Sequence, residues 1–177
     1  MKNIALFLFF IIFSTNLYAQ KSAIELSGDI LAAGLPVVAG SASLLYENNL
    51  NGAFQFTETY AAQLALTYAL KFIVNERRPN GGLYSFPSAH TASGFSSAAF
   101  IQRRYGWKVG LPAYILAGYT GWTRVYAKKH YIWDVAAGAI IGTGCAYLFT
   151  TPYEKNNLQL SFGKENEYYI VNVRFDF

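Results

Sequence analysis

Five long segments with almost no charged residues constrain the fold of this chain more than any other feature. Each is apolar or rich in small residues and has roughly the length of one helix; they cover residues 30–46, 54–74, 88–102, 109–123 and 131–150. Glycine and alanine are frequent in them, and small residues allow helices to pack closely. The sequence therefore predicts an all-α fold, a bundle of five to six mostly apolar helices.

The composition narrows the class of protein. Hydrophobic residues make up 53% of the chain and charged residues 14%, against roughly 45–50% and about 25% in ordinary soluble domains. A membrane protein or a very apolar helical bundle fits these values. The net charge is only +4 and the basic residues form no long run, so a nucleic-acid partner is not expected. Several segments are shorter than the roughly 20 residues that span a bilayer, so a soluble helical bundle is the alternative to a membrane protein.

The N-terminus resembles a secretory signal peptide. Lys2 supplies the positive charge, residues 4–13 form an apolar core, and Ala19 offers a small residue at a cleavage site. Without cleavage, the same segment would be a first membrane helix, although the apolar run is short for that. We therefore expect a signal peptide over 1–19 and a helical domain over 20–153, in a chain that leaves the cytoplasm.

The C-terminus has a different pattern. Apolar residues alternate with polar ones along 158–162 and again along 169–177, a period of two that is typical of strands. We expect a short β-hairpin within 154–177, joined at residues 163–166. Because an isolated hairpin is marginally stable in water, it should pack on the helices, on a partner or on a membrane surface.

The order of helices and loops predicts a topology. If the chain begins outside the cytoplasm, residues 75–86 and 124–130 lie on the outer side and the basic stretch 103–108 lies inside, as positively charged loops usually do. Lys128 and Lys129 are then exposed loop charges. The inner cations would flank helices and extend toward lipid headgroups; they are Arg103, Arg104 and Lys108. The expected location is the cell envelope, in a membrane with the candidate site facing the periplasm, or soluble in the periplasm.

A histidine and an aspartate stand four residues apart at the start of the last apolar segment. On a helix, His130 and Asp134 would share one face. A carboxylate that accepts the Nδ1 proton leaves Nε2 free to act as a nucleophile and stabilises the charge that develops. A surface ion pair is the simpler alternative. A metal site is not expected, because a zinc site needs three or four ligands and the chain has only two histidines and one cysteine.

Three cations lie close to these groups in the expected topology. Arg78 and Arg124 can each bind phosphate oxygens through a bidentate fork, and Lys71 adds a point charge. A phosphoryl group in transfer carries negative charge on three oxygens, so its catalysis depends on positioning and electrostatic stabilisation. The alternative is that these cations flank membrane helices and contact headgroups.

A further polar stretch, residues 87–90, resembles a helix start. Ser88 is a good N-cap residue, and the backbone N–H groups of Ala89 and His90 would form an anion site at the helix N-terminus. His90 could protonate a leaving oxygen, because its ordinary pKa suits a general acid. A buried, hydrogen-bonded histidine is the alternative.

Together these stretches resemble the signature of the type 2 phosphatidic acid phosphatase (PAP2) superfamily: Lys-x6-Arg-Pro, Pro-Ser-Gly-His and Ser-Arg-x5-His-x3-Asp. The first motif is matched in full from Lys71 to Pro79. The second is matched except that Ala89 replaces glycine, and the third except that Thr123 replaces serine. Thr123 keeps the hydroxyl, and an added Cβ at Ala89 matters only where φ must be positive.

The resemblance implies a phosphatase that needs no metal or other cofactor and forms a phosphohistidine intermediate. By position, His130 is the nucleophile, Asp134 orients it, and His90 is the general acid and later the base. The phosphate-binding residues that the resemblance implies are Lys71, Arg78, Ser88, Ala89 through its backbone, and Arg124.

The expected substrate is a lipid or isoprenoid phosphate or pyrophosphate, because apolar helices would place a lipid headgroup at the site. Three alternatives stay open: a soluble periplasmic acid phosphatase, a vanadate-dependent haloperoxidase, whose class resembles this phosphate site, and a non-enzymatic envelope protein whose hairpin recruits a partner. The sequence does not indicate the oligomeric state.

Overall fold

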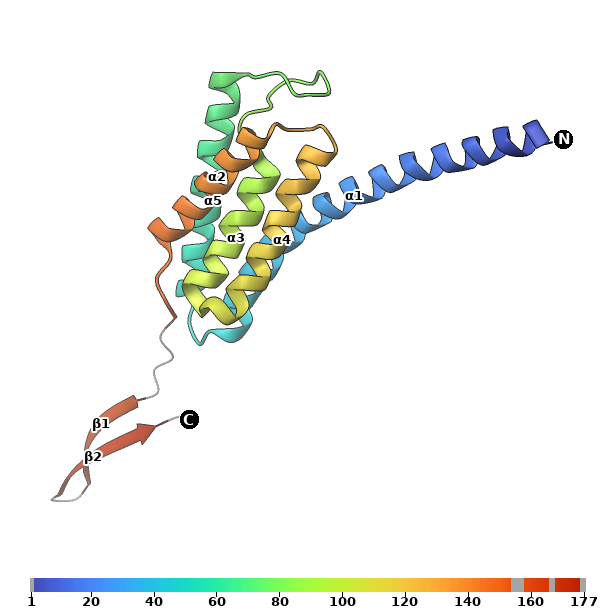
Figure 1. The fold of residues 1–177 in the computed structure, drawn as a ribbon. Coiled ribbons are helices and arrows are strands. Elements are labelled where there is room, and N and C mark those ends of the chain that lie inside the picture. The colour runs from blue at the N-terminus through green and yellow to red at the C-terminus, as the bar shows by residue number, and fades with distance from the viewer. Residues whose placement is uncertain (1, 154–157, 166–167, 176–177) are drawn as a thin grey trace.

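The computed structural model describes residues 2–153, 158–165 and 168–175. Its helices, in chain order, are α1 (Lys2–Tyr46), α2 (Asn51–Val74), α3 (Ala89–Tyr105), α4 (Trp107–Tyr126) and α5 (Ile132–Phe149). They form one bundle, from which the N-terminal half of α1 extends (Figure 1). The predicted all-α helical bundle is confirmed, and the ends of α2 to α5 lie within three residues of the expected positions.

The first helix is much longer than expected. A start at residue 30 was predicted, whereas α1 is continuous from Lys2 to Tyr46 and contains Pro36. The expected start followed the apolar pattern, which polar residues such as Glu25 and Asp29 interrupt. Such residues lower helix propensity only slightly, so they do not end a helix. Removal of residues 1–19 as a signal peptide stays a prediction.

The central helix, α3, is built from small and polar residues. It packs against all four other helices, and its buried positions include serines, alanines, one threonine and one glycine. Its contact with α5 is especially close at Gly138 and Gly142. A Cβ added at Gly142 would lie 2.4 Å from the carbonyl oxygen of Ala92. Small residues on both helices therefore allow α5 and α3 to touch along their backbones.

The bundle buries polar side chains and exposes large apolar ones. Thr59, Gln63 and Thr67 on α2 are fully buried. Large exposed apolar side chains include those of Phe72, Leu111, Ile115, Ile140 and Leu148. This inverted distribution is typical of helices packed through small residues and surrounded by lipid. Two segments, Ala23–Tyr46 and Ile132–Phe149, are long and apolar enough to cross a membrane.

The prediction of a basic loop over residues 103–108 is wrong. The helix α3 continues to Tyr105 and α4 begins at Trp107, with only Gly106, at a φ of 88°, between them. Arg104 is buried instead of extending toward headgroups. Its Nε and Nη2 donate to the two carboxylate oxygens of Glu47 at 2.8 and 2.5 Å, at the end of α1. The local sequence gave no sign of this distant partner.

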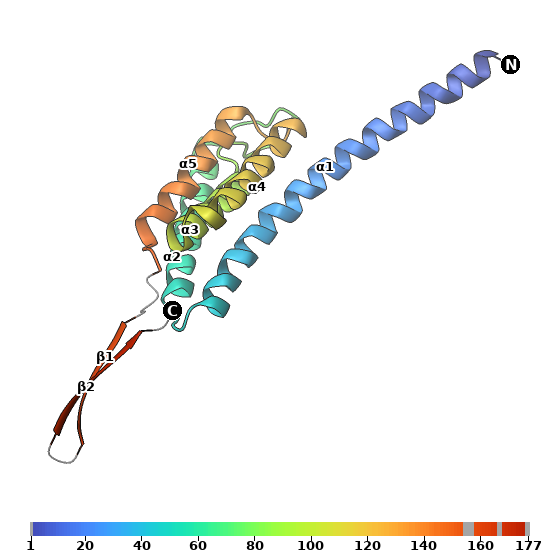
Figure 2. The same ribbon diagram turned by 60° about the horizontal axis from the view of Figure 1, so that its bottom comes forward.

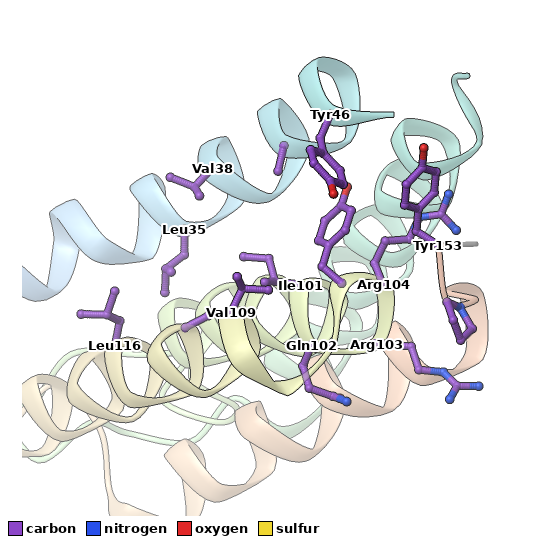
Figure 3. Close-up of a pocket in the computed structure, with 15 residues that line it drawn as sticks. Leu35, Val38, Tyr46, Ile101, Gln102, Arg103, Arg104, Val109, Leu116 and Tyr153 are labelled. Carbon is purple, nitrogen blue, oxygen red and sulfur yellow. The ribbon is translucent and has the colours of Figure 1, made fainter. Parts of the chain in front are cut away.

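A groove of about 1050 Å³ lies between the second half of α1 and the α3–α4 corner. Leu35 and Val38 of α1 face Val109 and Leu116 of α4 across it (Figure 3). Its lining is mostly apolar, with Arg104 toward its far end. The groove does not separate the helices along their whole length, because Leu35 and Ala39 of α1 share the buried core with Ala113 and Ala117 of α4.

Two strands follow the bundle. β1 (Leu158–Glu165) and β2 (Tyr168–Phe175) pair antiparallel and lie away from the helices (Figure 2). The expected turn begins too early, because Gly163 lies within β1 opposite Ile170; residues 166–167 lie outside the described residues. Among the described elements, each strand contacts only the other. The expected packing of the hairpin on the helices is not seen among the described residues, and its packing on a partner or a membrane stays a prediction.

Candidate active site

The three polar stretches converge at one end of the bundle, where α2 and α4 end and α3 and α5 begin (Figure 1). A cavity of about 330 Å³ opens there. The residues that line it are Glu25, Asp29, Arg78, His90, Arg124, Lys129 and His130. The sequence predicted Arg78, His90, Arg124 and His130 as site residues. It did not predict Glu25, Asp29 or Lys129.

His130 and Asp134 form a buried pair at the start of α5. His130 Nδ1 lies 3.4 Å from Asp134 Oδ2, an ion-pair distance without hydrogen-bond alignment. The pair does not lie on one helical face, because α5 begins only at Ile132 and His130 precedes its N-cap. Asp134 Oδ2 also accepts from Ser85 Oγ at 2.5 Å and from the N–H of Tyr131 at 2.8 Å. The carboxylate is therefore fixed by two connecting loops.

The surroundings of His130 favour its neutral form. Burial lowers the pKa of this histidine from 6.5 to about 4, and the nearby cations of Lys71 and Arg78 act in the same direction, while Asp134 opposes them. At neutral pH the imidazole is therefore uncharged and retains the lone pair that a nucleophile needs.

Two arginines bring positive charge to the cavity. Arg124 is buried, and its guanidinium donates to Asp29 Oδ1 at 2.5 Å, to the carbonyl oxygen of Glu25 at 2.7 Å and to Thr123 Oγ1 at 3.0 and 3.1 Å. The Nε of Arg78 is buried and has no hydrogen-bond partner among the described residues. A buried donor without an acceptor is costly, so an anion in the cavity would stabilise this group.

Three predicted phosphate-binding residues are not among those that line the cavity. Lys71 Nζ donates to the carbonyl oxygens of Tyr84 and Ser85 at 2.8 and 3.4 Å. Ser88 is the N-cap of α3, as predicted, and its hydroxyl accepts from the hydroxyl of Thr91 at 2.9 Å. Ala89 is the first residue of that helix. These contacts shape the loop before α3, and a direct role in phosphate binding stays a prediction.

The residues that sequence reasoning missed come mainly from α1. Asp29 Oδ1 lies 3.1 Å from His90 Nε2, and Glu25 Oε1 lies 2.9 Å from Lys129 Nζ. The interpretation of Lys129 as a plain exposed loop charge is therefore wrong, because it lies at the rim of the cavity and is paired. The available signal was the spacing of Glu25 and Asp29, two acids four residues apart before a long uncharged segment.

Metal ligands do not gather in the described part of the chain: no three His, Cys, Asp or Glu side chains there come together as a metal site. The metal independence implied by the sequence stays a prediction.

Comparison with known proteins supports this geometry. The PAP2 superfamily model matches residues 52–158, which include all three motifs. The chain belongs to the PAP2 superfamily. The predicted resemblance is thereby confirmed, and so is the prediction that the chain is a phosphatase of this type.

Two curated relatives come from Helicobacter pylori strain J99. A lipid A 4′-phosphatase is 32% identical over 149 residues, covering 77% of this chain and 74% of the relative. A lipid A 1-phosphatase is 32% identical over 131 residues, covering 69% of each.

Solved structures share the fold. LpxE from Aquifex aeolicus aligns with a TM-score of 0.60 at 21% identity, covering 75% of this chain and 84% of LpxE. The transmembrane PAP2-type phosphatidylglycerolphosphate phosphatase of Bacillus subtilis aligns with a TM-score of 0.54 at 21% identity, over 82% of this chain and 92% of that one.

Proposed function

We propose that this PAP2 phosphatase hydrolyses the phosphate monoester or pyrophosphate of a lipid or isoprenoid, through a phosphohistidine on His130, at the outer face of a membrane. The observation that carries the proposal is the buried pair of His130 and Asp134 beside a cavity lined by Arg78 and Arg124. A neutral, oriented imidazole next to two guanidinium groups suits attack on a phosphate.

The proposed reaction has two steps. In the first, His130 Nε2 attacks phosphorus, the P–O ester bond breaks, and His90 gives its proton to the leaving oxygen. In the second, His90 takes a proton from water, the water oxygen attacks phosphorus, the P–N bond breaks and inorganic phosphate leaves. Arg78 and Arg124 bind the phosphoryl oxygens, where negative charge accumulates in both transition states.

The relatives and the surface support a lipid substrate. Relatives covering two thirds or more of the chain are named as phosphatases of lipid A, so lipid A phosphates come first among the candidates. The exposed apolar side chains and the two membrane-length helices support a substrate presented at a bilayer. Phosphatidate, phosphatidylglycerol phosphate and undecaprenyl pyrophosphate carry the same reactive group and complete the panel.

A phosphate-release assay over this panel in detergent tests the proposal. His130→Ala should abolish release, whereas Glu58→Gln, which removes a charge from an exposed position on α2, should leave it unchanged. Labelled substrate, quenched in alkali, should leave acid-labile phosphate on the wild-type chain and none on His130→Ala. Release by His130→Ala at the wild-type rate would refute the nucleophile assignment, and loss of activity in EDTA would refute the metal-free mechanism.

Cell fractionation tests the membrane part of the proposal. The chain should stay with membranes until detergent is added, and lipid phosphates should be better substrates than small water-soluble ones. Extraction without detergent, together with a preference for small phosphate esters, would favour the soluble periplasmic acid phosphatase instead.

A further inference from the structure

The carboxylate of Asp29 occupies a specific position in the cavity. Its Oδ1 lies 3.1 Å from Nε2 of His90 and 2.5 Å from Nη1 of Arg124. Asp29 belongs to none of the three motifs and comes from α1. We infer that Asp29 is a positioning residue, which orients His90 and favours the protonated form of the ring that gives its proton to the leaving oxygen. This inference rests on the proposed function.

The contact between α1 and the site is built by close packing. Gly28 lies against α4 so tightly that an added Cβ would be 2.0 Å from Thr123 Oγ1 and 2.4 Å from Arg124 Nη2. One turn away, the carbonyl oxygen of Ala32 accepts from Ser93 Oγ of α3 at 2.9 Å. The segment that carries Asp29 is therefore fixed on both α3 and α4.

The charges around His90 show why a carboxylate is needed there. His90 lies near the cations of Arg124 on α4, Arg78 in the loop before α3 and Lys71 on α2, and among the described residues Asp29 is the acid that acts on it. Burial and these three cations lower the pKa of His90 below its ordinary value and so disfavour the imidazolium that a general acid must be, while Asp29 acts in the opposite direction. A carboxylate beside Nε2 favours the protonated ring and fixes its orientation. The proton on Nδ1 is then the one delivered to the substrate.

The leaving group provides the sharpest test. The constant kcat/KM covers the steps up to release of the alcohol. An alkoxide leaving from a lipid phosphate needs a proton, whereas nitrophenolate leaves from an aryl phosphate without one. Asp29→Asn should lower kcat/KM for the lipid phosphate about 10- to 100-fold, a part of the usual general-acid contribution. For nitrophenyl phosphate, the change should be smaller than about threefold, because the proton is not required.

Two further measurements use the same variants. The basic limb of the pH profile with the lipid phosphate should move to lower pH in Asp29→Asn, because His90 loses its proton more easily. Asp29→Glu keeps the charge and should recover part of the lost activity. Glu58→Gln, the exposed control on α2, should leave both substrates and the pH profile unchanged.

The remaining outcomes contradict the inference in distinguishable ways. Equal losses on both substrates would make Asp29 a purely structural residue. An unchanged kcat with a lower KM and tighter inhibition by inorganic phosphate would make it a competitor for the phosphate site, and unchanged kinetics would remove any role. In each case His130→Ala should be inactive on both substrates; an active His130→Ala would refute the proposed function itself.

Discussion

The two histidines of the site are each paired with an aspartate, but the pairs are built differently. His130 and Asp134 lie four residues apart, and both side chains are buried. His90 and Asp29 come from helices far apart in the sequence, and their side chains are 44% and 43% exposed. The first pair depends on one local turn of chain, whereas the second depends on how α1 packs against the bundle.

Because the two pairs differ in burial, substitutions in them should affect stability and catalysis to different degrees. The Asp134 carboxylate is fully desolvated and one of its oxygens accepts from two donors, so its loss leaves buried groups without partners. The Asp29 carboxylate is half exposed, and ion pairs with that much solvent contribute little to stability. We therefore expect substitutions at Asp134 to affect both folding and activity, and those at Asp29 to affect mainly activity.

The largest effect is expected from Asp134→Asn. An amide can present its N–H₂ group to His130 and hold the wrong tautomer, and in a comparable triad this costs about 10⁴ in kcat. We expect a loss on the order of 10³- to 10⁴-fold on both lipid and aryl phosphates, with a free energy of unfolding lower by about 1–3 kcal/mol. Steady-state kinetics and thermal unfolding in detergent measure the two effects. A loss confined to the lipid phosphate would show that Asp134, like Asp29, acts only on protonation of the leaving group.

A smaller effect is expected from Gly28→Ala, which disturbs the pair of His90 and Asp29 by changing how α1 packs. The added methyl group would overlap the side chains of Thr123 and Arg124, so α1 or these side chains must move, which disturbs the contacts of Asp29 with Arg124 and His90. We expect roughly a tenfold loss of kcat/KM on the lipid phosphate, by the same reasoning as for Asp29→Asn. Gly34→Ala is the matched control on the same helix, because nothing lies within 4 Å of its added Cβ. Its activity should stay at the wild-type level, and its stability should rise by up to about 1 kcal/mol.

Full activity of Gly28→Ala would show that the close contact of Gly28 with Arg124 is not needed for catalysis. Loss of activity in both glycine variants would show instead that α1 tolerates no added side chain, so that the effect is not specific to Asp29.

The parts of the fold that sequence reasoning found are those with local signals. Ser88 caps α3, as its residue type predicted. Gly106, at positive φ, separates α3 from α4, and this sharp break was missed because the basic residues around it were taken as a longer loop. The start of α1 was missed because the predicted helix followed only the apolar pattern, which begins after the polar residues Glu25 and Asp29. The pair of Arg104 and Glu47 was missed because α1 and α3 meet only in the folded bundle.

The site residues also fall into those with a local sequence signal and those without one. Fixed spacing within each motif singled out His130, Asp134 and Arg124 as candidates, although His130 and Asp134 do not share the helical face that their spacing predicted. Asp29 carries no such spacing to His90. Its place depends on the direction of α1 and on the close contact at Gly28, which are properties of packing. Residues of this kind become visible only when the helices are placed in space.

The smallest effect, and the most direct check on the buried pair, concerns the acid side of the pH profile. With a pKa lowered to about 4, His130 is only about one tenth protonated at pH 5, whereas an ordinary histidine would be about 97% protonated there. The constant kcat/KM for nitrophenyl phosphate does not include the second step, in which His90 is the base. Corrected for ionisation of the substrate, it should therefore fall by only about 10% between pH 7 and pH 5. The ¹⁵N resonances of His130, identified by their absence in His130→Ala, should titrate with a midpoint far below 6.5. A midpoint near 6.5 would mean that water reaches His130, and the contrast between a buried and an exposed pair would be lost.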